Sequence, residues 1–319
     1  MTRPGNPVLV VGESLVDVVV APDGRRAEHV GGSPMNVAVG LARLDVPTVL
    51  LTRLGDDARG TRVAEHVGAS GVLLAGSSVR SGTATSTATA TLDENRAATY
   101  DFDLHWDLEP ADLQAVPALA DLRALHVGSL GTVLPPGRDL VADLVRRATD
   151  EELFVSYDPN VRPTFLSDRE QAWRDVRALA SGARLVKLSD EDALLLQPQR
   201  PADETAACLL DGSATELVLL TRGDQGASAF GDGLRLDLPA PPVQLVDTVG
   251  AGDSFMAATL AALDDWDLLA PGEGRLAALT DEHVATVLSG ALRAAALTCS
   301  RAGANPPRRS ELPATWPAG

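Results

Sequence analysis

The stretch Asp247-Thr248-Val249-Gly250-Ala251-Gly252-Asp253-Ser254-Phe255 determines how we interpret this chain. The apolar segment 243–246 before it is typical of a strand, and an Ala- and Leu-rich segment follows it, with Met256, Leu260 and Leu263 at helical spacing. We therefore predict a strand, a tight turn at residues 250–252, and a helix.

The predicted turn is suited to binding an anion. Glycine lets the backbone approach a ligand, and the first N–H groups of a helix lack internal partners and carry the positive end of its dipole. These features predict that Gly250, Ala251 and Gly252 steady a phosphoryl group while Asp253, in the first turn, accepts a proton from an attacking hydroxyl. An acidic first turn after a glycine loop is also common without such a function, so this stretch alone leaves both interpretations open.

Length and composition narrow the class of protein. The chain has 319 residues, 45% of them hydrophobic, which suffices for one large α/β domain. Its net charge is −17, with 44 acidic against 27 basic residues, so we expect no nucleic-acid partner, because phosphate backbones require basic patches. Two cysteines without a CxxC motif argue against a disulfide scaffold or a cysteine zinc site. With no apolar leader and no run of about 18 apolar residues, we expect a cytoplasmic protein without a membrane partner.

Two N-terminal stretches supply further candidate ligand contacts. Residues 7–12 are typical of a buried strand, and the strand-like segment 13–20 places Asp17 among apolar residues, where a carboxylate is costly without partners. Asp17 is therefore either a ligand contact or an outward-facing residue of an edge strand. Gly31-Gly32-Ser33-Pro34-Met35-Asn36 leads into a predicted helix, where Asn36 either meets a sugar hydroxyl or caps the helix.

A threonine-rich segment interrupts the strand–helix alternation. Residues 83–92 carry Thr at every odd position, and this period of two with β-branched residues predicts a strand. We expect a turn at residues 93–95 and a returning strand over 97–102. The hairpin suits a small sheet beside the main domain.

Strands and helices alternate in the rest of the chain, which predicts a mostly parallel sheet covered on both faces. We expect strands at 49–52, 123–128, 153–157, 184–188 and 216–221, helices at 37–44, 136–150, 168–181, 203–211 and 281–299, and a hairpin over 226–238. Ligands bind beyond the carboxyl ends of such strands. The residues at these ends are Asp158, Asn160, Arg162, Ser189, Asp192, Thr221 and Gly223.

Two motifs about 220 residues apart carry a family resemblance. Residues 31–38 and 247–253 resemble, in this order, the N- and C-terminal motifs of the PfkB (ribokinase-like) family of carbohydrate kinases. Gly12-Glu13 with Asp17, residues 158–162, and residues 221–223 fit the same pattern, and within the family the chain looks most like fructokinases. The likeness covers nearly the whole chain, which we expect to form a single domain over 1–319.

The resemblance implies a three-layer α/β/α fold with a mostly parallel central sheet and a small β-sheet lid from segments about 14–30 and 80–105. It implies ATP and Mg²⁺, sometimes with K⁺, a small sugar as substrate, and a homodimer through the lid. By position, Asp253 would be the base and 250–252 the anion hole. The other implied contacts are Asp17, Gly32, Asn36, Phe102 and Arg162 to the sugar, Lys187, Ser189, Thr221, Gly223 and Gly226 to the nucleotide, Asp192 to Mg²⁺ through water, and Asp247 to a monovalent cation.

The chain departs from the family pattern at two places. The Asn-x-x-Glu motif appears here as Ser189-Asp190-Glu191-Asp192, and the shorter Asp192 has less reach toward Mg²⁺. Asp45 stands where glycine is usual, which we interpret as a surface change.

The predicted function is phosphorylation of a primary sugar hydroxyl by ATP, with D-fructose giving fructose 6-phosphate. Alternative substrates are 2-keto-3-deoxygluconate, ribose, another ketose or a nucleoside. A non-catalytic sugar sensor on the same fold is a further alternative, against which the intact Asp253 and glycine turn argue. A dinucleotide-dependent dehydrogenase does not fit, because Glu13-Ser14 follows Gly12 where a Gly-x-Gly-x-x-Gly motif belongs.

Overall fold

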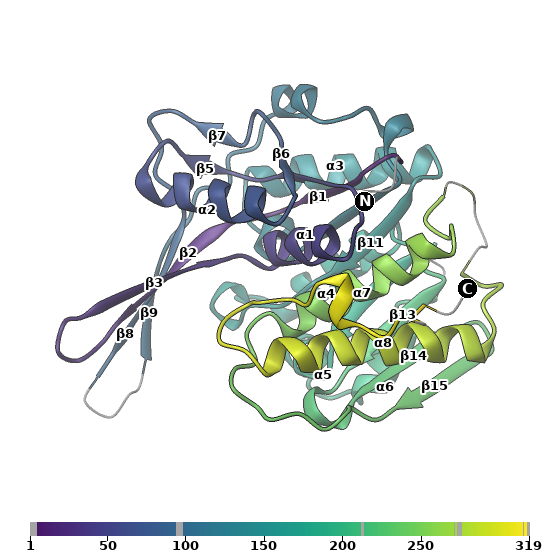
Figure 1. Ribbon diagram of the computed structural model, residues 1–319. Helices are drawn as coiled ribbons and strands as arrows, with labels where there is room; N and C mark the ends of the chain where they lie inside the picture. The colour runs from purple at the N-terminus through teal and green to yellow at the C-terminus, as the bar shows by residue number, and fades with distance from the viewer. Residues whose placement is uncertain are drawn as a thin grey trace.

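The protein is a three-layer α/β/α structure (Figure 1). The computed structural model describes residues 5–93, 98–211, 214–270, 272, 276–314 and 316–317. A nine-stranded sheet forms the middle layer, in the order β15-β14-β13-β12-β11-β10-β1-β4-β6. Neighbouring strands are parallel except where β14 pairs with β13 and β15. The strands are β1 (Val8–Val11), β4 (Thr48–Leu51), β6 (Leu73–Leu74), β10 (Ala124–Gly128), β11 (Phe154–Asp158), β12 (Leu185–Ser189), β13 (Leu217–Thr221), β14 (Ala227–Gly231) and β15 (Leu234–Leu238).

Both faces of this sheet are buried because its strands are apolar at consecutive positions. In β1, Val8 and Val10 join one hydrophobic core, and Leu9 and Val11 join the other. One core is closed by α1 (Ser33–Arg43), α2 (Ala58–Ala69), α7 (Ala251–Asp265) and α8 (Asp281–Cys299), and the other by α3 (Gly137–Asp150), α4 (Arg169–Ala180), α5 (Asp190–Leu196) and α6 (Ala202–Ala207). The predicted fold class is confirmed.

A four-stranded sheet projects from the main body (Figure 1). It joins β3 (Arg26–Gly31), β2 (Leu15–Val20), β8 (Thr87–Leu92) and β9 (Ala98–Asp103), in that order. Two antiparallel hairpins meet along the parallel pair β2–β8. These strands come from the two segments that the sequence assigned to a lid, while the predicted turn at 93–95 lies largely outside the described residues. That the sheet moves as a lid stays a prediction.

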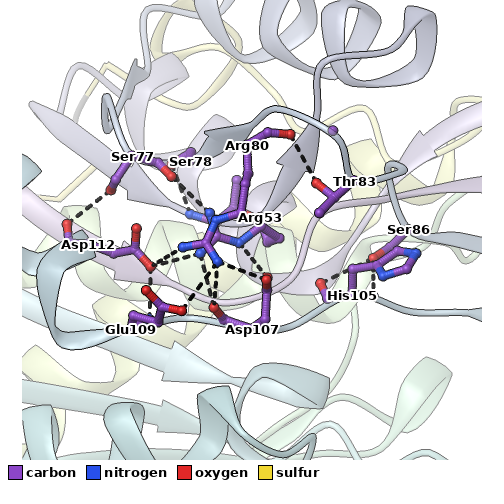
Figure 2. Close-up of polar contacts among 12 residues, drawn as sticks. Arg53, Ser77, Ser78, Arg80, Thr83, Ser86, His105, Asp107, Glu109 and Asp112 are labelled. Carbon is purple, nitrogen blue, oxygen red and sulfur yellow. Dashed lines mark hydrogen bonds and ion pairs between the residues drawn. The ribbon is translucent and has the colours of Figure 1, made fainter.

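A buried arginine network anchors the base of the projecting sheet (Figure 2). The Arg53 side chain is fully buried and forms ion pairs with Asp107 (2.8 Å) and Asp112 (2.7 Å). Arg80, in the short strand β7 (Val79–Arg80) that pairs with β5 (Leu54–Gly55), reaches Asp107 at 2.9 Å. Arg80 precedes the β8–β9 hairpin and the two aspartates follow it, so the network ties both ends of the hairpin to the main domain.

Two local predictions are wrong, and one short helix was not predicted. Residues 243–246 form no strand; they lie on the surface, and the Val246 N–H donates to the Cys299 carbonyl at the end of α8 instead of to a neighbouring strand. Strand β12 ends at Ser189, because the Ser189 hydroxyl accepts from the Asp192 N–H and caps α5, a helix that the apolar pattern did not predict. The helix expected over 203–211 spans only Ala202–Ala207.

The interpretation of Asp45 is confirmed. This residue is exposed and has a φ of +66°, the left-handed conformation in which glycine is usual.

Candidate active site

The N-terminus of α7 is built for close approach to a ligand. Gly250 caps the helix with a φ of +76°, and a Cβ there would lie 2.6 Å from the Ala304 Cβ, so only glycine fits. Helix α7 begins at Ala251, so its first N–H groups and the positive end of its dipole lie at this turn. The predicted helix is therefore confirmed, but the turn before it lies at residues 249–250, since Ala251 and Gly252 already belong to α7.

Asp253 lies buried in the first turn of α7. Its carboxylate accepts hydrogen bonds from the Ser33 hydroxyl at 2.6 Å and from the Asn36 amide at 2.8 Å, both on α1. Burial raises the pKa of Asp253 above its ordinary value, although the bonds from Ser33 and Asn36 oppose the shift. A carboxylate with a raised pKa is a better proton acceptor and is held here in a fixed orientation, as a general base requires.

A buried ion pair lies beside this turn. The Lys187 Nζ on β12 contacts Asp158 Oδ2, at the end of β11, at 2.8 Å. Burial lowers the pKa of Lys187, but the attraction of Asp158 and Asp192 outweighs it and holds that pKa above its ordinary value. Lys187 therefore stays charged, and it reaches the start of α7, since a Cβ at Gly252 would lie 3.1 Å from its Nζ.

Asp17, Gly32 and Glu13 lie close together before the start of α1. Burial raises the pKa values of Asp17 and Glu13, and the positive charge of Arg162 opposes both shifts. Gly32 has a φ of +118°, and a Cβ there would lie 2.5 Å from the Glu13 carbonyl. Carboxyls, an amide and a guanidinium around a glycine turn are suited to binding a polyhydroxylated molecule.

Glu13 is one of the most perturbed groups of this cleft. Its side chain is buried at the carboxyl end of β1, and Oε2 accepts the Gly131 N–H at 2.9 Å. Burial raises its pKa from 4.5 to about 7, even though the Gly131 bond favours the charged form. Glu13 thus changes charge near neutral pH.

Phe102 joins the projecting sheet to the main domain. Its ring, on β9, meets the Phe165 ring edge-to-face at a centroid distance of 5.3 Å. Phe165 belongs to the turn that follows Arg162, so this contact brings β9 beside the predicted sugar-binding residues.

The predicted nucleotide-binding residues lie at the same edge of the sheet. Ser189 and Thr221 end neighbouring parallel strands in register. Gly223 opens a short turn with a φ of +50°, and a Cβ at Gly226 would lie 2.0 Å from the Leu238 carbonyl. Gly226 is thus required by the backbone of the hairpin, and its contact to a nucleotide stays a prediction.

The two predicted cation contacts already hold backbone groups. Asp192 accepts the N–H groups of Val161 (2.7 Å) and Ser189 (3.1 Å). Asp247 accepts those of Val249 (3.1 Å) and Gly303 (2.8 Å), and these bonds lower its pKa, so it stays ionised. Among the described residues no group of three or more acidic, His or Cys side chains is arranged to hold a metal. This donor set fits an ion held mainly by a substrate's phosphates.

The structure brings Asn36 and Asp253 into direct contact and places Lys187 beside Gly252. The sequence placed Asp158 at a ligand-binding strand end and Glu13 and Ser33 within motifs, but it gave none of the three an individual role. A polar residue inside an otherwise apolar strand end was the available signal for Glu13 and Asp158.

Comparison with known proteins identifies the family of this chain. A family model described as pfkB family carbohydrate kinase matches residues 6–311. The chain is 32% identical over 274 residues to a fructokinase of Rhizobium leguminosarum bv. trifolii, covering 82% of this chain and 81% of that one. It is 33% identical over 264 residues to a fructokinase of Klebsiella pneumoniae, covering 80% and 84%.

Solved structures support the fold. A fructokinase from Xylella fastidiosa matches with a TM-score of 0.80 at 23% identity, covering 96% of this chain and 97% of that one. An aminoimidazole riboside kinase from Salmonella enterica matches with a TM-score of 0.76 at 22% identity, covering 94% and 95%.

The fold and the family match define the class of the protein, a phosphotransferase that acts on a carbohydrate hydroxyl. The chain belongs to the pfkB family of carbohydrate kinases, and it is an ATP-dependent sugar kinase. In the part of the chain that the structure describes, no helix is long and apolar enough to cross a membrane.

Proposed function

We propose that this kinase transfers the γ-phosphoryl group of ATP to the primary 6-hydroxyl of D-fructose. The observation that carries the reaction is Asp253, buried in the first turn of α7 and oriented by Ser33 and Asn36. The choice of fructose is supported by two fructokinases that are 32% and 33% identical to this chain over 274 and 264 aligned residues.

In the proposed reaction, Asp253 accepts the proton of the attacking hydroxyl as the new P–O bond forms. The bond between the γ-phosphorus and the bridging oxygen breaks, and ADP leaves with that electron pair. The N–H groups at the start of α7 stabilise the charge on the phosphoryl oxygens. Asp17, Gly32, Asn36, Phe102 and Arg162 would hold the sugar, and Lys187, Ser189, Thr221, Gly223 and Gly226 the nucleotide.

Mg²⁺ would reduce the repulsion between the phosphate oxygens of bound ATP. Asp192 would approach this ion through water, since its two oxygens already accept backbone N–H groups. A K⁺ ion would lie at the loop around Asp247, whose lowered pKa keeps the carboxylate charged.

Three further properties belong to the same proposal. The whole chain, 1–319, acts as one kinase domain with segments 14–30 and 80–105 as its lid, and it works in the cytoplasm without nucleic acid or membrane. Two copies associate through the projecting sheet, whose outer strands β3 and β9 each leave one edge without a neighbouring strand in the described structure. Light scattering of the purified protein tests the dimer, and a monomer would contradict it.

A substrate panel tests the proposed function. ADP release would be measured with MgATP and fructose, ribose, another ketose, 2-keto-3-deoxygluconate or a nucleoside, and the position of the phosphate would be found by NMR. We expect the highest kcat/KM with fructose and a phosphate on O6. A higher value with ribose or a nucleoside would contradict the substrate, and no ADP release with any acceptor would favour the sugar sensor.

A further inference from the structure

Lys187 is buried at the point where the proposed phosphoryl transfer occurs. The side chains of Lys187 and Asp158 are only 5% and 1% exposed. A buried ammonium is costly unless it is paired, and Asp158 supplies that partner at 2.8 Å. The pair bridges β11 and β12 at the carboxyl edge of the sheet, where the cleft lies.

The ammonium faces the anion-binding turn directly. A Cβ built on Gly252 would lie 3.1 Å from Lys187 Nζ and 3.4 Å from Cε, so the absence of a side chain at Gly252 makes room for the lysine. Of the three N–H donors of the ammonium, the described structure uses one, toward Asp158. The other two donors belong to an ammonium that approaches Gly252, in the first turn of α7.

The partner of Lys187 has one carboxylate oxygen that is not satisfied in the described structure. Asp158 Oδ1 is buried and has no hydrogen-bond partner among the described residues. Unpaired buried acceptors are rare in folded proteins and often mark sites that work with a ligand. This orphaned oxygen and the Gly252 contact are two independent observations on the same ion pair.

We propose that Lys187 is a catalytic residue, which donates a hydrogen bond from Nζ to the γ-phosphoryl group in transit, and that Asp158 positions it. The proposal rests on the proposed function and deepens it. As the hydroxyl proton passes to Asp253 and the P–O bond to ADP breaks, Lys187 keeps its own proton and balances the negative charge on the moving oxygens. This role differs from nucleotide binding alone, because it acts on kcat and not only on the KM for ATP.

Replacement of Lys187 by Met is the direct test, with Arg184→Met as the matched control. Arg184 precedes the same strand at its opposite end and forms a comparable, largely buried pair with Glu216 (2.5 Å). We expect Lys187→Met to lower kcat by about 10²–10³-fold, the usual loss for one such donor, with the KM for sugar nearly unchanged. Arg184→Met should lower the melting temperature but keep kcat.

If Lys187→Met leaves Asp158 unpaired and fails to fold, the double variant Lys187→Met/Asp158→Asn removes both charges and carries the same kinetic test. Near-normal kcat in the folded variant, or a rise in the KM for ATP alone, would overturn the proposal. Failure of the proposed function itself is distinct, because the wild-type protein would then release no ADP with any sugar.

The pH dependence of activity in Asp158→Asn tests the positioning role, because it would not change if the ion pair were purely structural. The charged or titratable groups around Lys187 are Asp158, Asp192 on α5, Asp253 on α7 and His126 on β10, and His126 stays neutral because burial lowers its pKa to about 3. Loss of the Asp158 charge lowers the pKa of Lys187, so activity should begin to fall at a lower pH on the alkaline side. If the activity of Asp158→Asn falls at the same alkaline pH as that of the wild type, Asp158 does not position Lys187 in the proposed way.

Discussion

At the scale of single residues, three carboxyl groups of the cleft have pKa values raised by burial but differ in their partners. Asp253 accepts two hydrogen bonds from α1, Asp17 lies near Arg162, and Glu13 accepts the Gly131 N–H. Because their neighbours differ, the same substitution should have different effects at each site.

Asp253→Asn should lower kcat by about 10²–10⁴-fold, the usual contribution of a general base. Asparagine keeps the size of the side chain and one oxygen to accept from Ser33 or Asn36, but it cannot take the hydroxyl proton. Steady-state kinetics with the fold checked by thermal melting measures this, and a kcat close to wild type would rule out the base assignment.

Asp17→Ala should raise the KM for the sugar with little change in kcat. Asp17 lies on β2, on the projecting sheet, so it should hold hydroxyls that do not react and bind them equally in the ground and transition states. The expected loss of sugar affinity is about 1.5–3 kcal/mol, typical of a hydrogen bond to a charged group. A large fall in kcat at constant KM would show that Asp17 acts on the chemical step instead.

These residues show how far the sequence reaches at this scale. The motifs predicted Asp253 and its turn, because glycines before an acidic first turn carry their chemistry locally. The hydrogen bond from Ser33 to Asp253 joins residues 220 positions apart in the sequence, and the ion pair of Lys187 with Asp158 joins two neighbouring strands. Such contacts depend on how elements pack, which a local pattern does not encode.

At the scale of elements, the periodicity of the sequence predicted the strands and helices that bury one regular face. The alternating threonines gave β8, and the apolar run gave α8. It failed at residues 243–246, where apolar side chains lie on the surface, and at α5, whose start depends on side-chain capping by Ser189. A strand needs a neighbouring edge and a short helix needs its cap, and neither condition is visible in an apolar pattern.

Hydrogen exchange of β8 and β9 should slow when sugar binds. These strands belong to the same small sheet as Asp17, and Phe102 brings β9 against the turn after Arg162, so a bound sugar would join the sheet to the main domain. A closed lid would also exclude water from ATP. Exchange would be compared with and without saturating sugar by mass spectrometry.

The β14–β15 hairpin serves as the internal control for this experiment. It is an antiparallel hairpin at the edge of the main sheet, and its exchange should not respond to sugar. Unchanged exchange in β8 and β9 at saturating sugar would contradict the lid, and equal slowing in both hairpins would indicate a general stabilisation instead.

At the scale of the whole molecule, the two-faced sheet collects buried charges at its carboxyl edge. The strand–helix alternation predicted such a sheet, but not its strand order, because the order depends on which strands pair across long connections. The chain carries a net charge of −17, yet Lys187 and Arg162 place positive charge in the cleft that would receive phosphate. The buried groups at this edge make the stability of the fold depend on pH.

Glu13 should make the wild-type protein less stable than Glu13→Gln as the pH rises from about 4.5 to about 7. The unfolded chain releases the Glu13 proton near pH 4.5, while the folded protein keeps it to about pH 7, so rising pH favours the unfolded state over this interval. The difference of 2.5 between these pKa values corresponds to on the order of 3 kcal/mol.

Glutamine keeps an oxygen that can accept the Gly131 N–H but has no proton to release. Urea unfolding of both proteins between about pH 4 and 8, which spans the folded and unfolded pKa values of Glu13, measures the difference in their free energies of unfolding. The contributions of all other titrating groups cancel in this difference. A difference that stays constant over this range, or one that favours the wild type at higher pH, would show that Glu13 is ionised in the folded cleft.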